Sequence, residues 1–277
     1  MKKLLFVLLA FMMAVAAFAG GQQDASGSLE KIKKAGKIRI GIFSDTPPFG
    51  FVDAKGIYQG YDVYFAHRIA KDMLGDENAI EFVSVDPANR VEFLQSDKVD
   101  IIMANFTVTP DRALAVDFTL PYMKVAIGIV SPDRAPIKKI SDLEGKELIV
   151  NPGTTSEVYF AKNYPKIKLQ KYEQISAGFN ALKDGRAPAL AQDNTVVFAW
   201  SVQNPGFTTT IQSIGSLDTI AAAVRKGNKE LLDWLNNEIS TGVGDTFFHD
   251  DYKATLLPVY GKAVDPESVV VEHGVVK

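Results

Sequence analysis

The sequence predicts an α/β protein of two similar units, because the same order of elements occurs twice along its 277 residues. In each pass, short apolar strands alternate with stretches whose apolar residues recur at helical spacing. This alternation is typical of a mostly parallel sheet with helices on its faces. Residues 122–131 connect the two passes and are apolar and β-branched, unlike a linker. We therefore expect them to form a strand that crosses from one unit to the other.

The first unit begins with the alternating strand KIRIGI and continues through a loop that contains two consecutive prolines. Its first long helix carries apolar residues three and four positions apart, and Asp62 is placed to cap it. The expected elements are a strand over 37–42, a loop over 45–56, the helix that Asp62 opens, a strand over 81–85, a short helix over 91–94 and a strand over 100–104.

The second unit repeats the pattern from about residue 139. Thr154 and Glu157 have the spacing of a capping box at the start of a helix. The expected elements are a short helix capped by Ser141, strands over 148–150, 168–172 and 187–191, and helices from Thr154, over 176–182 and over 194–200. A late strand over 220–224 and an amphipathic helix over 231–239 follow.

We expect the chain to return to the first unit after about residue 216, and so to cross between the units twice. The predicted lobe 1 is then residues 29–122 with 216–277, and lobe 2 is residues 123–215. Two crossing strands make a hinge, and a cleft between hinged lobes is a favoured place for a ligand.

The N-terminus predicts export. Lys2 and Lys3 precede an apolar run that ends at Ala17-Phe18-Ala19, which fits the small-x-small rule of a secretory cleavage site. The run is shorter than the roughly 20 apolar residues of a membrane span. We expect a signal peptide over 1–19 that is cleaved after Ala19, a flexible leader over 20–28, and a periplasmic protein.

Composition narrows the chemistry. The chain has no cysteine, so we expect no lipid-anchor cysteine, no disulfide and no thiolate metal site. It has 30 basic and 33 acidic residues without a basic stripe, which argues against nucleic acid as a partner. The three histidines, His67, His249 and His273, match no metal-ligand spacing. We expect no metal and no cofactor.

Arg112 is the first candidate for ligand binding. Thr109 and Pro110 form a helix start after a predicted strand, and Arg112 falls in the first turn, where a cation opposes the helix dipole. A planar guanidinium suits a carboxylate. On spacing alone, a solvated surface arginine is the more common case.

Two further stretches also follow strands and open helices. Gly153-Thr154-Thr155 could bind an anion through free N–H groups, and Asp193 could neutralise an ammonium group. Taken singly, helix capping is the better explanation of the first stretch and an equally good or better explanation of Asp193. Because all three stretches lie at the carboxyl edge of strands, they are expected to converge, and together they complement a zwitterionic α-amino acid.

Other side chains remain open between two roles. Phe49, Phe51 and Tyr122 could line the pocket or pack in the core. Arg90 could reach the ligand side chain or face solvent. If Arg90 reaches the ligand, an acidic amino acid such as glutamate or aspartate becomes an alternative ligand.

The chain resembles the bacterial extracellular solute-binding proteins of polar amino-acid ABC importers, from about Ile38 to Tyr260, and is most similar to a branch that binds cysteine. It departs from that branch at Gln192, where histidine is usual, and at Ala187-Pro188, where Gly-Asp is usual. The resemblance is carried by PPFGFVDAKG, GYDVYFAHRIA, ANRVEFLQSDKVDIIMANFTVTPDR, VDFTLPYMKVAIGIV, VNPGTTSEVYFAKNYP, QDNTVVFAW and AVRKGNKELLDWLN.

The resemblance implies a two-lobed periplasmic-binding-protein fold and a monomer that delivers an amino acid, cysteine first, to a membrane permease. It implies a binding protein and not an enzyme, although a few dehydratases share the scaffold. The implied roles are Arg112 for the α-carboxylate, Thr107 and the backbone near Asn105 for the α-carboxylate and α-amino groups, Thr155 with Thr154 for the carboxylate, and Asp193 for the ammonium.

Overall fold

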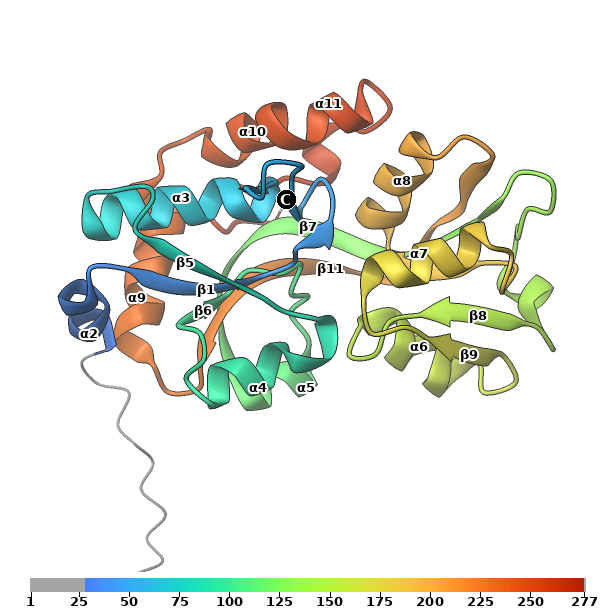
Figure 1. The fold of residues 1–277 in the computed structure, drawn as a ribbon, viewed down its shortest axis with the longest axis horizontal. Coiled ribbons are helices and arrows are strands. Elements are labelled where there is room, and N and C mark those ends of the chain that lie inside the picture. The colour runs from blue at the N-terminus through green and yellow to red at the C-terminus, as the bar shows by residue number, and fades with distance from the viewer. Residues whose placement is uncertain (1–27, 277) are drawn as a thin grey trace, which may run out of the picture.

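The computed structural model describes residues 28–276, and the chain forms two lobes that lie side by side (Figure 1). The predicted signal peptide and all of the predicted leader except Ser28 lie outside the described residues. Ser28 itself begins a helix, α2 (Ser28–Ala35), which the sequence analysis did not predict. None of the described helices combines the length and the apolar character that a membrane span requires.

One eight-stranded sheet runs through both lobes in the order β5-β1-β6-β11-β7-β10-β8-β9. Strands pair in parallel at each end of this order, β5-β1-β6 in the first lobe and β10-β8-β9 in the second. The strands are β1 (Ile38–Ile42), β5 (Ile80–Ser84), β6 (Ile101–Ile102), β7 (Val116–Pro132), β8 (Glu147–Val150), β9 (Lys168–Lys171), β10 (Leu190–Asp193) and β11 (Phe207–Arg225).

Helices cover both lobes (Figure 1). In the first lobe they are α2, α3 (Tyr61–Leu74), α4 (Arg90–Gln95), α5 (Pro110–Ala115), α9 (Lys229–Asn237), α10 (Phe247–Asp251) and α11 (Leu257–Tyr260). In the second lobe they are α6 (Thr155–Asn163), α7 (Ile175–Lys183) and α8 (Asn194–Gln203). Short helical turns add η1 (Pro87–Asn89), η2 (Ile140–Leu143), η3 (Glu238–Gly242), η4 (Tyr252–Leu256) and η5 (Pro266–Ser268).

The two long strands β7 and β11 confirm the predicted double crossing. They have 17 and 19 residues and pair antiparallel between the two parallel ends of the sheet. The predicted lobe boundaries at residues 122 and 216 fall inside them. Their register shifts between Ile214 and Asp218, where Gly215 has a φ of 76°. Such a bulge interrupts the ladder and bends the strand.

Most predicted strands and helices are confirmed to within one to three residues, but two predicted caps are wrong. Helix α3 starts before Asp62, because the backbone N–H groups of Tyr61 and Asp62 donate to the carbonyls of Pro48 and Phe49, both at 3.0 Å. The Asp62 side chain is free to turn inward and is fully buried. The turn η2 also starts before Ser141, because Asp142 Oδ2 accepts from the backbone of Lys138 and Lys139.

The predicted loop over 45–56 contains more structure than expected. It folds with the residues that follow into a three-stranded antiparallel sheet, β2 (Asp45–Thr46), β3 (Gly50–Val52) and β4 (Tyr58–Gln59). The two-residue strands β2 and β4 were too short to show an alternating pattern in the sequence. This small sheet brings Asp45 to the start of α7 in the other lobe, where its Oδ2 accepts from Ser176 N at 2.9 Å.

Candidate ligand-binding site

A small cavity lies between the lobes, at the carboxyl ends of β1, β6, β8 and β10, which is where open α/β sheets bind ligands. The space that protein atoms do not fill is about 260 Å³, including open solvent. Both lobes contribute to its lining, which consists of Phe43, Arg90, Asn105, Thr107, Arg112, Thr154, Thr155, Ile175, Gln192, Asp193 and Val196.

Arg112 is held in place by backbone carbonyls of both lobes. The side chain of Thr109 accepts from Arg112 N at 3.2 Å and so caps α5 as predicted. The guanidinium donates to Thr107 O and, across the cleft, to Gly153 O, both at 2.7 Å, and it lies over the ring of Phe106 at 4.7 Å. Burial lowers the pKa of Arg112 to about 10, so it stays charged at neutral pH. It is therefore not a solvated surface arginine.

Arg90 is a second buried guanidinium, and it is 2% exposed. Its Nε donates to Pro87 O at 3.0 Å, and its Nη1 donates to Ala104 O at 2.8 Å and to Asn105 O at 3.2 Å. Its Nη2 reaches across the cleft to Gly153 O at 3.1 Å. Four carbonyls thus engage a group that has five N–H donors. The solvent-facing alternative for Arg90 is wrong.

The start of α6 brings hydroxyl and N–H groups to the cavity from the second lobe. Thr154 caps the helix by accepting from Glu157 N at 3.2 Å, and its hydroxyl donates to Asn151 O at 2.7 Å. Glu157 bonds back to Gly153 N at 2.7 Å, one residue earlier than the expected capping box requires. The N–H groups in the first turn of a helix have no intrahelical acceptor, so this turn can bind an anion.

Asp193 supplies the negative charge of the cavity. It ends β10 and is 6% exposed, and within residues 28–276 its carboxylate accepts no hydrogen bond. Burial raises the pKa of Asp193 to about 6, while the charges of Arg90 and Arg112 lower it and that of Asp218 raises it. Gln192 stiffens the turn, because its side chain donates to Asn151 Oδ1 at 3.0 Å and accepts from Asp193 N at 3.1 Å.

The structure brings together all of the predicted polar side chains of the site and none of the predicted aromatic ones, which are Phe49, Phe51 and Tyr122. Phe49 and Tyr122 are not in the cavity lining and lie in the core, each at 0% exposed. Three apolar lining residues were missed, namely Phe43, Ile175 and Val196. Phe43 directly follows β1, and its position at the end of a predicted strand was the signal for it in the sequence.

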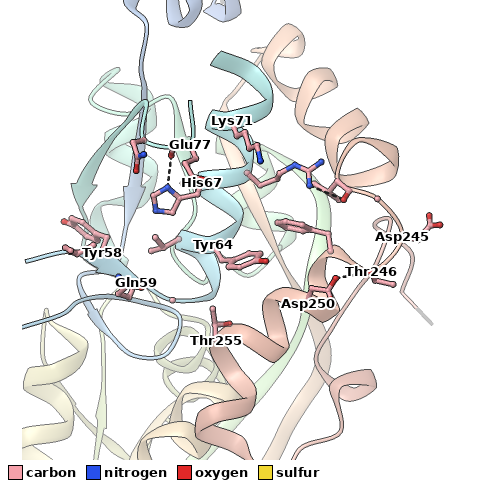
Figure 2. Close-up of a pocket in the computed structure, with 18 residues that line it drawn as sticks. Tyr58, Gln59, Tyr64, His67, Lys71, Glu77, Asp245, Thr246, Asp250 and Thr255 are labelled. Atoms are coloured by element: carbon pink, nitrogen blue, oxygen red, sulfur yellow. Dashed lines mark hydrogen bonds between the residues drawn. The ribbon is translucent and has the colours of Figure 1, made fainter. Parts of the chain in front are cut away.

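A larger hollow, about 1490 Å³ including open solvent, lies between α3 and residues 243–255 (Figure 2). Its lining contains acidic and basic side chains, and some of these side chains form hydrogen bonds within the protein. For example, His67 Nδ1 lies 2.7 Å from Glu77 O. Across the described part of the chain, no group of three or more histidine or acidic side chains is arranged to hold a metal ion.

Two lobes joined by two long strands, with a buried and charged cavity between them, define a solute-binding protein for a small polar molecule. Residues 38–246 match the bacterial extracellular solute-binding proteins, family 3, and the chain belongs to this family. This membership confirms the prediction of a solute-binding protein rather than an enzyme.

Similar solved structures include the cysteine-binding protein from Campylobacter jejuni, with a TM-score of 0.87 and 51% identity, and the solute receptor for L-cysteine of Neisseria gonorrhoeae, with 0.86 and 50%. Each comparison covers 88% of this chain and 99% of the other. The ABC transporter glutamine-binding protein of Bacillus subtilis (strain 168) is 28% identical over 91% of this chain and 97% of its own length.

Proposed function

We propose that this protein is the amino-acid-binding component of an ABC importer, and that it binds L-cysteine. The proposal depends most on one observation: Arg112 from one lobe and Asp193 from the other line the same small cavity. A carboxylate against Arg112 and an ammonium group against Asp193 would neutralise both buried charges. Thr107, Asn105, Thr154 and Thr155 would complete the hydrogen bonds to these two groups.

The rest of the cavity favours a small side chain without charge. Phe43, Ile175 and Val196 form an apolar part of the lining, which suits a short and weakly polar thiol. Arg90 is the only other cation of the lining, and it is engaged by four backbone carbonyls. The acidic ligands glutamate and aspartate would need a free cation, so we place cysteine before them. The two cysteine-binding proteins of known structure, which are 50% and 51% identical to this chain in sequence, support the same choice.

The proposal includes the route of the protein and its partner. The signal peptide is removed after Ala19, and the mature protein is a periplasmic monomer that delivers its ligand to a membrane permease. Intact-mass measurement of exported protein tests the first step, since a mass that retains residues 1–19 contradicts it.

A thermal-shift screen of the twenty amino acids tests the ligand class. The protein is unfolded and refolded first, so that no ligand is carried over from expression. A ligand at a hundred times its Kd adds about 2.7 kcal/mol to the free energy of unfolding. We expect L-cysteine with a reductant to raise the melting temperature most, and glutamate and aspartate little. If none of the twenty amino acids raises the melting temperature, the proposal is rejected.

A further inference from the structure

The backbone of Asn105 is held from both sides in a conformation that few residues adopt. Its φ is 42°, in the left-handed region that disfavours side chains. Its N–H donates to Asp62 Oδ2 at 3.0 Å, and its carbonyl accepts from Arg90 Nη1 at 3.2 Å. The buried carboxylate of Asp62 and the buried guanidinium of Arg90 thus form hydrogen bonds to the backbone of the same residue.

Asp62 itself lies behind the cavity and does not line it. It is 0% exposed in α3, and its second oxygen, Oδ1, accepts from the hydroxyl of Tyr122 at 2.6 Å. Tyr122 lies on the crossover strand β7. One carboxylate therefore ties a helix and a hinge strand to the loop that follows β6.

The side chain of Asn105 shows what these hydrogen bonds achieve. Both amide atoms, Nδ2 and Oδ1, are buried, and neither has a hydrogen-bond partner within the described residues. A buried amide without a partner is rare in proteins and calls for an explanation. Because Asn105 lines the cavity, a ligand there is the partner that its amide can reach.

We propose that Asp62 is a positioning residue of the ligand site: with Arg90 it fixes Asn105 in the left-handed conformation and so directs the amide of Asn105 at the ligand. The inference rests on the proposed amino-acid-binding function. Burial raises the pKa of Asp62 to about 7, whereas Tyr122, the Asn105 N–H and the charge of Arg90 lower it. The two donated hydrogen bonds and the nearby cation offset part of the cost of burial, and the carboxylate that holds Asn105 forms as the pH rises through about 7.

A double-mutant cycle tests the inference, with L-cysteine and a reductant in calorimetric titrations. Asp62→Asn leaves one oxygen for two donors, and a buried donor without an acceptor is costly, so we expect cysteine affinity to fall roughly five- to a hundredfold. Asn105→Gly also weakens binding, since it removes the amide. Glycine adopts a positive φ freely. Adding Asp62→Asn to Asn105→Gly should therefore weaken binding less than about threefold further.

The cycle separates positioning from plain structural support. Asp251→Asn is the matched control, because Asp251 is equally buried in the same lobe and is not in the cavity lining. We expect it to change the melting temperature and not the affinity. If Asp62→Asn does not fold, Tyr122→Phe removes one donor from the same carboxylate and should weaken binding severalfold, again only when Asn105 is present.

The inference is overturned if Asp62→Asn, or Tyr122→Phe in its place, lowers affinity by the same factor with and without Asn105→Gly, or changes only the melting temperature. Failure of the proposed function looks different, because the wild type itself then binds no amino acid. Wild-type binding with an unaffected Asp62 variant rejects the positioning role alone.

Discussion

Two opposite charges from different lobes dominate the site at the scale of single residues. Arg112 and Asp193 line one cavity, and both are largely removed from water. An unpaired charge in such a place is costly, whereas a zwitterion supplies a counter-charge to each. The arrangement thus couples charge neutralisation to the approach of the two lobes.

Arg112→Ala should weaken binding by tens to thousands of times, since the loss of one partner of a buried charge pair costs about 2–5 kcal/mol and each tenfold is about 1.4 kcal/mol. Arg112→Lys should also weaken it, because an ammonium cannot donate at the same time to two carbonyls and a carboxylate in the planar geometry of arginine. Calorimetric titration measures both. Arg186→Ala, which alters an exposed arginine paired with Asp184, is the control and should bind like wild type.

Asp193 predicts how affinity depends on pH. Its pKa is raised to about 6 without ligand, and only the charged form attracts an ammonium group. Below pH 6 binding must displace a proton from Asp193. The contribution of Asp193 to affinity should therefore be constant above about pH 7 and should fall about tenfold between pH 7 and pH 5. Titrations at several pH values check this.

Asp193→Asn should bind weakly and should lose the tenfold fall in affinity that is centred near pH 6. Arg90, Arg112 and Asp218 also act on Asp193. Guanidinium groups in proteins remain charged over this pH range. A slope that survives in Asp193→Asn belongs to Asp62, whose pKa is about 7. A flat profile for the wild type contradicts the assignment of Asp193 to the ammonium group.

The sequence predicted charged site residues better than apolar ones. Arg112 stands out because a cation in the first turn of a helix opposes the helix dipole, and Asp193 was selected because it follows a strand and opens a helix as the other two stretches do. Phe43, Ile175 and Val196 are typical core residues, and whether such a side chain lines a cavity or fills a core depends on the tertiary packing. The same ambiguity between cavity and core applied to Phe49 and Tyr122, and both are core residues.

Predicted elements were reliable where periodicity supported them, as in β1 and α3, whereas composition alone placed the start of β7 six residues too late. The caps of Asp62 and Ser141 were wrong because a helix start is also set by acceptors elsewhere in the chain. The carbonyls of Pro48 and Phe49 start α3 from a distant loop. No local pattern reports such contacts.

Helix α7 gives the clearest case of a cap from another element. Its own N-cap residue, Gln174, makes no side-chain capping bond, and Asp45 Oδ2 from the other lobe accepts from Ser176 N at 2.9 Å. Loss of a cap costs about 1 kcal/mol. Since this cap forms only between adjacent lobes, Asp45→Ala should weaken cysteine binding about fivefold while the ligand-free melting temperature hardly changes.

Asp53→Ala is the matched control for Asp45→Ala. The Asp53 carboxylate also accepts from backbone N–H groups, those of Lys55 and Ile57, but all of them lie in one loop of the first lobe. This variant should lower the melting temperature and leave affinity unchanged. Equal affinities of Asp45→Ala and the wild type would show that the cross-lobe cap does not contribute to closure.

At the scale of the whole molecule, two long strands and several polar contacts across the cleft join the lobes. β7 and β11 connect the lobes through a ladder that is bulged between Ile214 and Asp218, while Arg90 and Arg112 donate across the cleft to the carbonyl of Gly153. Two strands that join α/β lobes permit a hinge rotation, and the ligand drives it only by contacting both lobes. Contacts that form only between closed lobes should therefore set affinity.

Substitution of Gly153 tests directly whether contacts between the closed lobes set affinity. A Cβ added there would lie 2.7 Å from Ala88 Cα and 2.8 Å from Pro87 O, both in the other lobe. Gly153→Ala should therefore destabilise the closed form by about 1–3 kcal/mol, as overpacking does. Cysteine affinity should fall roughly five- to a hundredfold. Small-angle scattering at a ligand concentration that saturates the wild type should show a larger radius of gyration for the variant.

Gly185→Ala separates this clash from backbone strain. Gly185 has a φ of 72°, close to the 78° of Gly153, but a Cβ at Gly185 would meet nothing within 4 Å. Both variants carry the cost of a positive φ in open and closed forms alike, so both should melt at lower temperature. Only Gly153→Ala should lose affinity and compaction. If the two variants bind cysteine equally well, the contact between Gly153 and the first lobe does not govern closure, and the hinge argument fails at this position.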